Sequence, residues 1–112
     1  MARLFILYNL KDEVTEEDFE SWVNSYKGPF ISGLPAVKNY TLTKPVGAVQ
    51  MAGGPPGPVD SPYQYAAVVN VESLPAYGKD TESEEYQQKF MPQFVQKVKD
   101  FLILQSNEVF DG

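Results

Sequence analysis

The sequence predicts an α+β fold whose elements follow one another as β-α-β-β-α-β. Three observations carry this prediction: a continuous apolar segment near the N-terminus, two further strand-like segments, and two segments with apolar residues at helical spacing. This order is the split βαβ, or ferredoxin-like, arrangement, in which helices cover one face of a four-stranded antiparallel sheet. With 112 residues, we expect residues 1–112 to form one domain.

The first strand is predicted at residues 3–9, RLFILYN. Its apolar run does not alternate, which is typical of a strand covered on both faces, so we expect it at the centre of the sheet. The first helix is predicted to begin at Thr15, because Asp18 follows at capping-box spacing. Its inner face carries four residues at helical spacing, Phe19, Trp22, Val23 and Tyr26.

The first helix is predicted to end at Gly28-Pro29, since proline lacks an N–H and biases the preceding residue away from helical geometry. Trp22, the largest side chain, is expected to anchor this helix on the sheet. The second strand is predicted at residues 37–44, with Lys38, Tyr40 and Leu42 on one side and the side chains between them, Val37 included, on the other.

Residues 45–62 form a Gly- and Pro-rich loop in which we expect neither helix nor strand. Such a loop is either a mobile, solvated connection or a flap over a pocket. The third strand is predicted at residues 63–71, YQYAAVVNV, where Tyr65 shares a face with alternate small and β-branched residues.

In the second half of the chain, the sequence pattern predicts a short helix that begins at Ser73 and stops at Gly78. Thr81 or Ser83 then caps a longer amphipathic segment. Pro92 lies inside that segment and either kinks the helix or opens a second one. The apolar stripe of the segment is Tyr86, Phe90, Phe94 and Val98, and residues 101–105 are the last predicted strand.

Composition excludes several classes of function. The net charge of −6 disfavours nucleic acid and anionic membranes as partners. The chain contains no cysteine and no histidine, so we expect no disulfide and no metal site, and chemistry must come from other side chains or a bound cofactor. No apolar run is long enough to span a membrane, and we expect a cytoplasmic location.

The sheet is expected to need a second cover. The first and last strands are apolar on both sides, whereas the two helices cover only one face. A second copy of the chain, packed sheet against sheet, would cover the other face, and twofold dimers are the commonest oligomers. We therefore predict a homodimer.

Several short motifs add a resemblance to a known family. They are ESW at residues 20–22, PF at 29–30, LPAV at 34–37, PYQY at 62–65 and VESLPAY at 71–77. Over residues 2–104 the chain resembles the dimeric α+β barrel superfamily, and within it the REDY-like HapK group and, more distantly, the EthD-type proteins. The resemblance implies a dimer of ferredoxin-like subunits, each with a small-molecule pocket between sheet and helices.

Relatives in this superfamily include monooxygenases, cyclases and isomerases that need no cofactor, and REDY-like members belong to prodigiosin-type pigment pathways. We accordingly expect no cofactor here. Many catalytic members use histidine, which this chain lacks. The resemblance implies a cofactor-independent enzyme of secondary metabolism, of cyclase, condensation or monooxygenase type, that acts on an aromatic, polyketide or pyrrole-like compound. The alternatives are a non-catalytic ligand-binding protein and a structural homodimeric module.

Candidate site residues follow from an excess of tyrosines, whose hydroxyls need partners when buried. The alternative is that these aromatics simply fill the core. As catalytic residues we predict Asp18, Tyr26 and Tyr65; as ligand-binding residues, Tyr8, Asn9, Trp22, Phe30, Tyr40, Asn70, Phe90 and Phe94.

Six of these aromatic residues are expected to line one cavity, namely Trp22, Tyr26, Tyr40, Tyr65, Phe90 and Phe94. If the strands present their other faces, Tyr8 and Asn70 replace Tyr40 and Tyr65. Asp18 is either a carboxylate base or a helix-capping residue. Asn9 and Asn70 either orient a ligand carbonyl or bond to loop backbone. Lys38 is either solvated or pairs with an anionic ligand.

Overall fold

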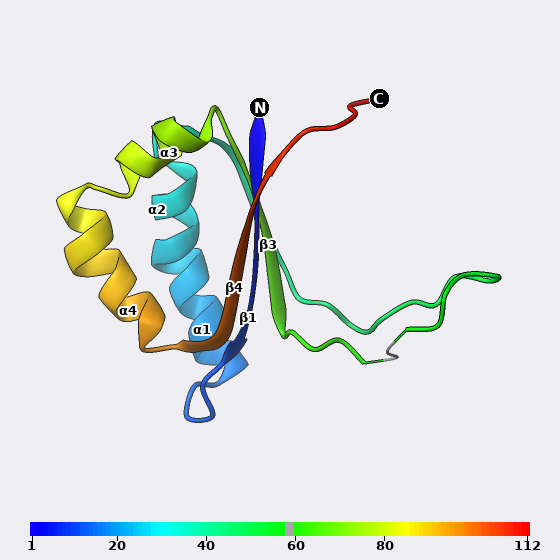
Figure 1. Cartoon of the computed structure of the whole chain (residues 1–112). Coiled ribbons are helices and arrows are strands. Elements are labelled where there is room, and N and C mark those ends of the chain that lie inside the picture. The colour runs from blue at the N-terminus through cyan, green and yellow to red at the C-terminus, as the bar shows by residue number, and fades with distance from the viewer. Residues whose placement is uncertain (58–59) are drawn as a thin grey trace.

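The computed structural model describes residues 1–57 and 60–112. Four antiparallel strands form one sheet in the order β2-β3-β1-β4 (Figure 1). β1 lies inside the sheet, as its continuous apolar sequence predicts. The strands are β1 (Ala2–Leu10), β2 (Val37–Thr43), β3 (Tyr65–Val71) and β4 (Val98–Asn107).

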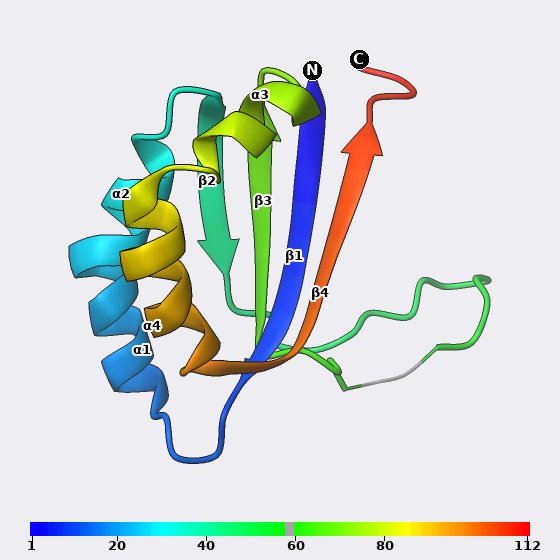
Figure 2. The same ribbon diagram turned by 60° about the vertical axis from the view of Figure 1, so that its left-hand side comes forward.

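The helical segments cover one face of this sheet, as two views show (Figures 1 and 2). The predicted ferredoxin-like α+β fold is therefore confirmed. Among the described residues, no helix is long and apolar enough to cross a membrane. The segments are α1 (Glu16–Trp22), η1 (Val23–Lys27), α2 (Gly28–Ser32), α3 (Leu74–Asp80), η2 (Glu85–Phe90) and α4 (Met91–Val95), where η marks π-helical turns.

The first helix does not end at Gly28-Pro29, contrary to the sequence prediction. It begins as predicted, with the Thr15 hydroxyl accepting the Asp18 N–H at 3.1 Å. It then widens into η1, where the Gly28 N–H bonds to the Val23 carbonyl, and continues through Pro29 as α2. A π-helical turn before a proline lets the helix continue where the proline supplies no N–H. A side chain at Gly28 would approach the Val23 carbonyl oxygen to 3.0 Å, so glycine suits this turn.

The helical segments between β3 and β4 also differ from the prediction, because α3 does not end at its glycine. Ser73 caps α3 as predicted, but the helix runs through Gly78 to Asp80, because one glycine costs a helix only about 1 kcal/mol. Of the two candidate caps for the next segment, Ser83 accepts the Tyr86 N–H at 3.2 Å. Pro92 stands in the first turn of α4, so it opens a second segment after η2.

A β-bulge changes which side chains of β2 face the helices. The register against β3 shifts between Val37 and Asn39, so Val37 pairs in the same layer as Tyr40, and Lys38 is exposed in the bulge. The predicted alternation, with Val37 opposite Tyr40, is wrong for this reason. β4 is also longer than predicted, since it begins at Val98.

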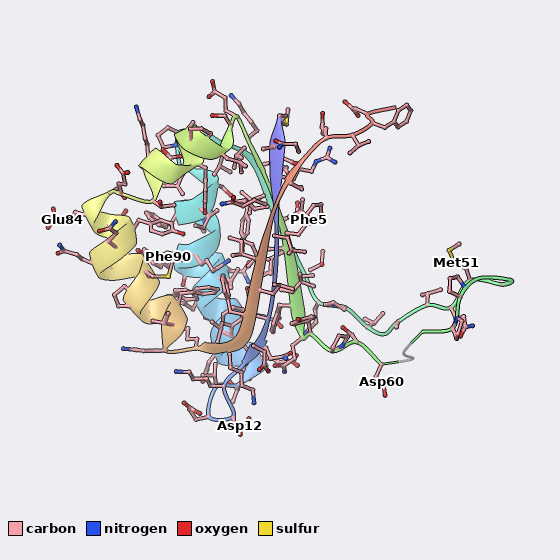
Figure 3. All side chains as sticks on the ribbon, in the orientation of Figure 1. Phe5, Asp12, Met51, Asp60, Glu84 and Phe90 are labelled. Atoms are coloured by element: carbon pink, nitrogen blue, oxygen red, sulfur yellow. The ribbon has the colours of Figure 1, made fainter. Side chains whose placement is uncertain are left out.

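The two faces of the sheet differ in cover. The core lies between sheet and helices, and its most deeply buried large side chains are Tyr8, Tyr65, Phe19, Leu4, Val69 and Val71. The opposite face carries exposed apolar side chains, among them Phe5, Leu102 and Leu104. Figure 3 shows Phe5 on this open face and Phe90 in the layer between sheet and helices.

The Gly/Pro-rich loop is an extended arm. Its described parts, residues 45–57 and 60–62, contain neither helix nor strand and reach away from the sheet on the side opposite the helices (Figure 1). Residues 58 and 59 of the predicted loop lie outside the described residues. The arm does not cover the helix-side core of its own chain, so the flap alternative does not apply to that core.

Candidate functional site

One apolar pocket opens between the helix layer and the sheet. It holds about 410 Å³ of space, its mouth included. Most of this space lies at the open mouth, and the enclosed interior is narrow. The mouth is at the edge strand β4, whose lining residues Phe101 and Ile103 are exposed. All four strands and the helices around them contribute to the lining, which is Ile6, Lys27, Ile31, Tyr40, Val69, Tyr77, Tyr86, Phe90, Met91, Phe94, Phe101 and Ile103.

Lys27 is the one cation in this lining. It lies on η1 and is only 4% exposed, which is rare for a lysine without a carboxylate partner. Its ammonium nitrogen lies over two rings, 4.6 Å from the centroid of Tyr40 and 5.3 Å from that of Phe94. Such contacts stabilise the charged form only in part. Burial therefore dominates and lowers the pKa of Lys27 to about 7.

Tyr40 supplies the hydrogen-bond partner of this amine. It lies on β2 facing the helices, and its phenolic oxygen accepts a hydrogen bond from Lys27 Nζ. Burial raises the pKa of Tyr40 above its ordinary value, so the phenol keeps its proton at neutral pH. The pair thus places an amine that is partly neutral at pH 7 beside a protonated phenol, inside an apolar wall.

Two further phenols line the same pocket. Tyr77 on α3 and Tyr86 on η2 both have a raised pKa, chiefly because they are buried. They are neutral hydrogen-bond donors at physiological pH. The pocket therefore combines aromatic and aliphatic walls with a few polar groups, which is the usual make-up of a small-molecule site.

Trp22 stands behind the pocket wall and does not line it. Its ring stacks at 6.0 Å on Phe90 and at 6.3 Å on Phe94, and its indole N–H donates to Gln93 at 2.9 Å. These three partners belong to η2 and α4, so Trp22 joins the two helices. The residue that anchors the helix on the sheet is Phe19 and not Trp22 as predicted. Phe19 is fully buried and packs on Tyr8 and Tyr65.

The other predicted tyrosines lie outside this pocket. Tyr65 is buried on the helix side of β3, and its hydroxyl donates to Glu20 at 2.7 Å beside a separate, more open hollow. Tyr8 and Tyr26 have buried hydroxyl groups for which the described residues offer no partner. Of the six aromatics expected in one cavity, the structure brings Tyr40, Phe90 and Phe94 together, and it places Tyr26, Trp22 and Tyr65 elsewhere.

The remaining predicted site residues have structural partners. Asp18 is exposed in the first turn of α1. Asn9 bonds the backbone of Pro62 and Gln64, and Asn70 accepts a hydrogen bond from Arg3 at 2.8 Å on the open face of the sheet. Phe30 packs on Phe90 at 5.2 Å without lining the pocket. Lys38 is exposed.

Sequence reasoning missed Lys27, although a signal for it exists. Phe19, Val23, Lys27 and Ile31 are spaced by four residues, so a helix that continues past Gly28 places Lys27 within the apolar stripe. The prediction ended the helix before Ile31. Without Ile31 the apolar stripe stops at Tyr26, and Lys27 is then interpreted as a basic residue in the last turn of a helix with an exposed end.

Solved structures with the same fold include an enzyme. HapK from Hahella chejuensis superposes with a TM-score of 0.76 at 18% identity, over 100% of this chain and 96% of that chain. A hydroxynitrile lyase from Passiflora edulis gives 0.74 at 16% identity over 98% and 96%. An EthD family protein from Bacillus halodurans gives 0.71 at 12% identity over 97% and 99%.

Two further neighbours with this fold, from Thermobifida fusca and Bacteroides fragilis, are described as dimeric. No curated protein sequence matches the chain significantly. A family model, described as REDY-like protein HapK, matches residues 2–109, which is nearly the whole chain. The chain therefore belongs to the REDY-like HapK family.

Proposed function

We propose that this chain is a homodimeric enzyme of secondary metabolism that acts without a cofactor on an aromatic, polyketide-like or pyrrole-like compound. The observation that carries the proposal is the buried pair of Lys27 and Tyr40 in an apolar pocket. A buried lysine with a lowered pKa is costly for stability and is typical of sites that use the amine. Phe90 and Phe94 would hold a flat ring beside it.

Within the proposal, Lys27 and Tyr40 exchange protons with the bound compound. The neutral amine accepts a proton near pH 7, and the phenol of Tyr40 donates a hydrogen bond to an oxygen on the ligand. General acid–base catalysis by such a pair accelerates condensation and cyclisation steps in which a proton is transferred. The predicted catalytic residues Asp18, Tyr26 and Tyr65 lie outside the lining of this pocket, so Lys27 and Tyr40 take their place in the proposal.

The homodimer in this proposal uses the open face of the sheet. In the middle of β1, β3 and β4, alternate residues present apolar side chains there, of which Phe5 is 36% and Leu104 49% exposed. An exposed apolar face of this kind is typical of an interface. A second copy fits it because the face would then meet its own equivalent, and fold neighbours are described as dimeric. The arm reaches out on this same side (Figure 1).

The fluorescence of the single tryptophan reports ligand binding and so tests the proposal. Trp22 stacks on Phe90 and Phe94, so a ring in the pocket is expected to change its fluorescence and to raise the melting temperature. Benzyl alcohol, indole and 2-acetylpyrrole are suitable probes. Lys27→Met is expected to weaken 2-acetylpyrrole binding about tenfold, the equivalent of one lost hydrogen bond.

The exposed Lys38→Met is the matched control and is expected to bind like the unchanged chain. The absence of saturable binding for all three probes, or equal binding by the Lys27→Met and Lys38→Met chains, would contradict the proposal. Natural compounds that co-purify with the chain and are recovered unchanged after incubation would favour the alternative function, non-catalytic binding.

A further inference from the structure

The groups that contact the amine of Lys27 are the uncharged rings of Tyr40 and Phe94 and the Tyr40 hydroxyl. In the described ranges 1–57 and 60–112, Lys27 forms no ion pair, and its hydrogen bond goes to the neutral phenol of Tyr40. The other titratable groups that line the pocket are also phenols, Tyr77 and Tyr86. Nothing around the amine therefore holds it in the charged form except ring faces and one hydroxyl oxygen.

This environment separates Lys27 from other lysines of the chain. Lys44 and Lys99 bond to carboxylates at 2.8 to 2.9 Å, and these partners raise the pKa of both groups. They stay protonated at neutral pH and have no lone pair to offer. The pKa of Lys27, lowered by burial to about 7, leaves a large share of neutral amine. A neutral lysine amine in an apolar site is a nucleophile for carbonyl carbon.

We infer that Lys27 forms an imine with the carbonyl group of an aromatic aldehyde held in the pocket, with Tyr40 as the proton donor. The inference rests on the proposed function, because it uses the same pocket, and it names the reactive class of the ligand. Phe90 and Phe94 hold the ring, while Lys27 Nζ and the Tyr40 hydroxyl lie in contact with each other. The carbonyl group therefore meets a nucleophile and an acid at one place.

The step balances without an oxidant or reductant. The lone pair of Lys27 Nζ forms the C–N bond while the carbonyl π electrons move to oxygen, which takes the proton of Tyr40. The nitrogen then returns a proton to Tyr40. Loss of the hydroxyl group with the second nitrogen proton releases one water molecule and leaves the C=N bond. Aldehyde and amine thus give imine and water.

Reductive trapping tests the inference on the full chain. The chain is incubated with benzaldehyde and sodium cyanoborohydride at about pH 7, where hydride adds to the imine carbon and fixes a benzyl group on the nitrogen. Peptide mapping by mass spectrometry then gives the label at each lysine. We expect Lys27 to be labelled at least about tenfold faster than Lys38, because burial lowers the pKa of Lys27 and leaves a large share of neutral amine at this pH. We also expect benzyl alcohol to slow the labelling of Lys27 alone.

A variant of Tyr40 gives a second test of the imine. Tyr40→Phe is expected to slow labelling of Lys27 several-fold and to leave labelling of Lys38 unchanged. The loss of the proton donor outweighs the gain in neutral amine from a lower Lys27 pKa, which is at most about twofold because about half of the amine is already neutral at pH 7. Label spread evenly over the exposed lysines, or an unlabelled Lys27, would overturn the imine. In that case, benzyl alcohol that still raises the melting temperature would leave the proposed function standing. If benzyl alcohol also fails to bind, both proposals fall.

Discussion

Lys27 on η1 donates a hydrogen bond to the phenolic oxygen of Tyr40 on β2, and both residues line the pocket between the helices and the sheet. In the part of the chain that the structure describes, no carboxylate forms an ion pair with this amine. The contact joins the first helix to the strand that follows it. A structural and a chemical consequence follow from this one pair, because burying a lysine costs stability and also changes its reactivity.

The first prediction concerns the pH dependence of stability. Between about pH 7 and its ordinary pKa of 10.5, Lys27 binds a proton in the unfolded chain and not in the folded one. The free energy of unfolding therefore rises with pH in this window. Relative to Lys27→Met, the unchanged chain should gain about 2–3 kcal/mol between about pH 7 and pH 9.5, measured by urea denaturation.

Measurements stay below about pH 10 because the pKa values of the buried tyrosines are raised. Their ionisation in the unfolded chain would lower stability above that pH. Lys38→Met serves as the control and should follow the unchanged chain. Parallel profiles for the unchanged chain and Lys27→Met would show that Lys27 keeps its proton throughout.

The second prediction tests the partner of Lys27. Tyr40→Phe removes the oxygen that accepts the hydrogen bond from Lys27, so the fold should lose about 1–2 kcal/mol at neutral pH. The same change should lower the pKa of Lys27 further, because that hydrogen bond favours the charged form. The rise of stability with pH should then begin at a lower pH.

A matched control for this change is Tyr63→Phe, which also removes one tyrosine hydroxyl but lies before β3, outside the pocket lining. It should leave the pH profile in place. A Tyr40→Phe profile that begins to rise at the same pH as the unchanged chain would mean that Tyr40 does not influence the amine.

The third prediction compares two aromatic residues of α1. Phe19 is fully buried against Tyr8 and Tyr65 of the sheet, whereas Trp22 is half-buried between the helices. Phe19→Ala should therefore cost about 3–5 kcal/mol of unfolding free energy. Trp22→Ala should cost less, since part of its ring already meets solvent. Chemical denaturation measures both, and a larger loss for Trp22→Ala would reverse this assignment.

The fourth prediction concerns assembly. Light scattering should give about twice the chain mass of 12.5 kDa. Leu104→Asp, on the open face of the sheet, should shift the chain to a monomer, because a carboxylate would be buried without a partner in the interface. Val95→Asp is the control: Val95 is similarly exposed, 52% against 49%, but lies on α4. Monomers with both variants, or with neither, would argue against this interface.

Local sequence patterns were sufficient for the order and type of the elements. The continuous apolar run of β1, the caps at Thr15, Ser73 and Ser83, and the alternation in β3 each depend on neighbours within a few residues. Such short-range preferences can be recognised from the sequence alone. The element order then leaves few topologies, so the ferredoxin-like sheet was predictable.

The tertiary structure alone decided which side chains meet at the site. Whether the helix continues through Gly28-Pro29 depends on a π-helical turn and on what packs over it, and this continuation buries Lys27. A single bulge in β2 moved Val37 to the side of Tyr40. The pocket draws side chains from every strand of the sheet, so its lining depends on register and helix placement, which no local pattern specifies.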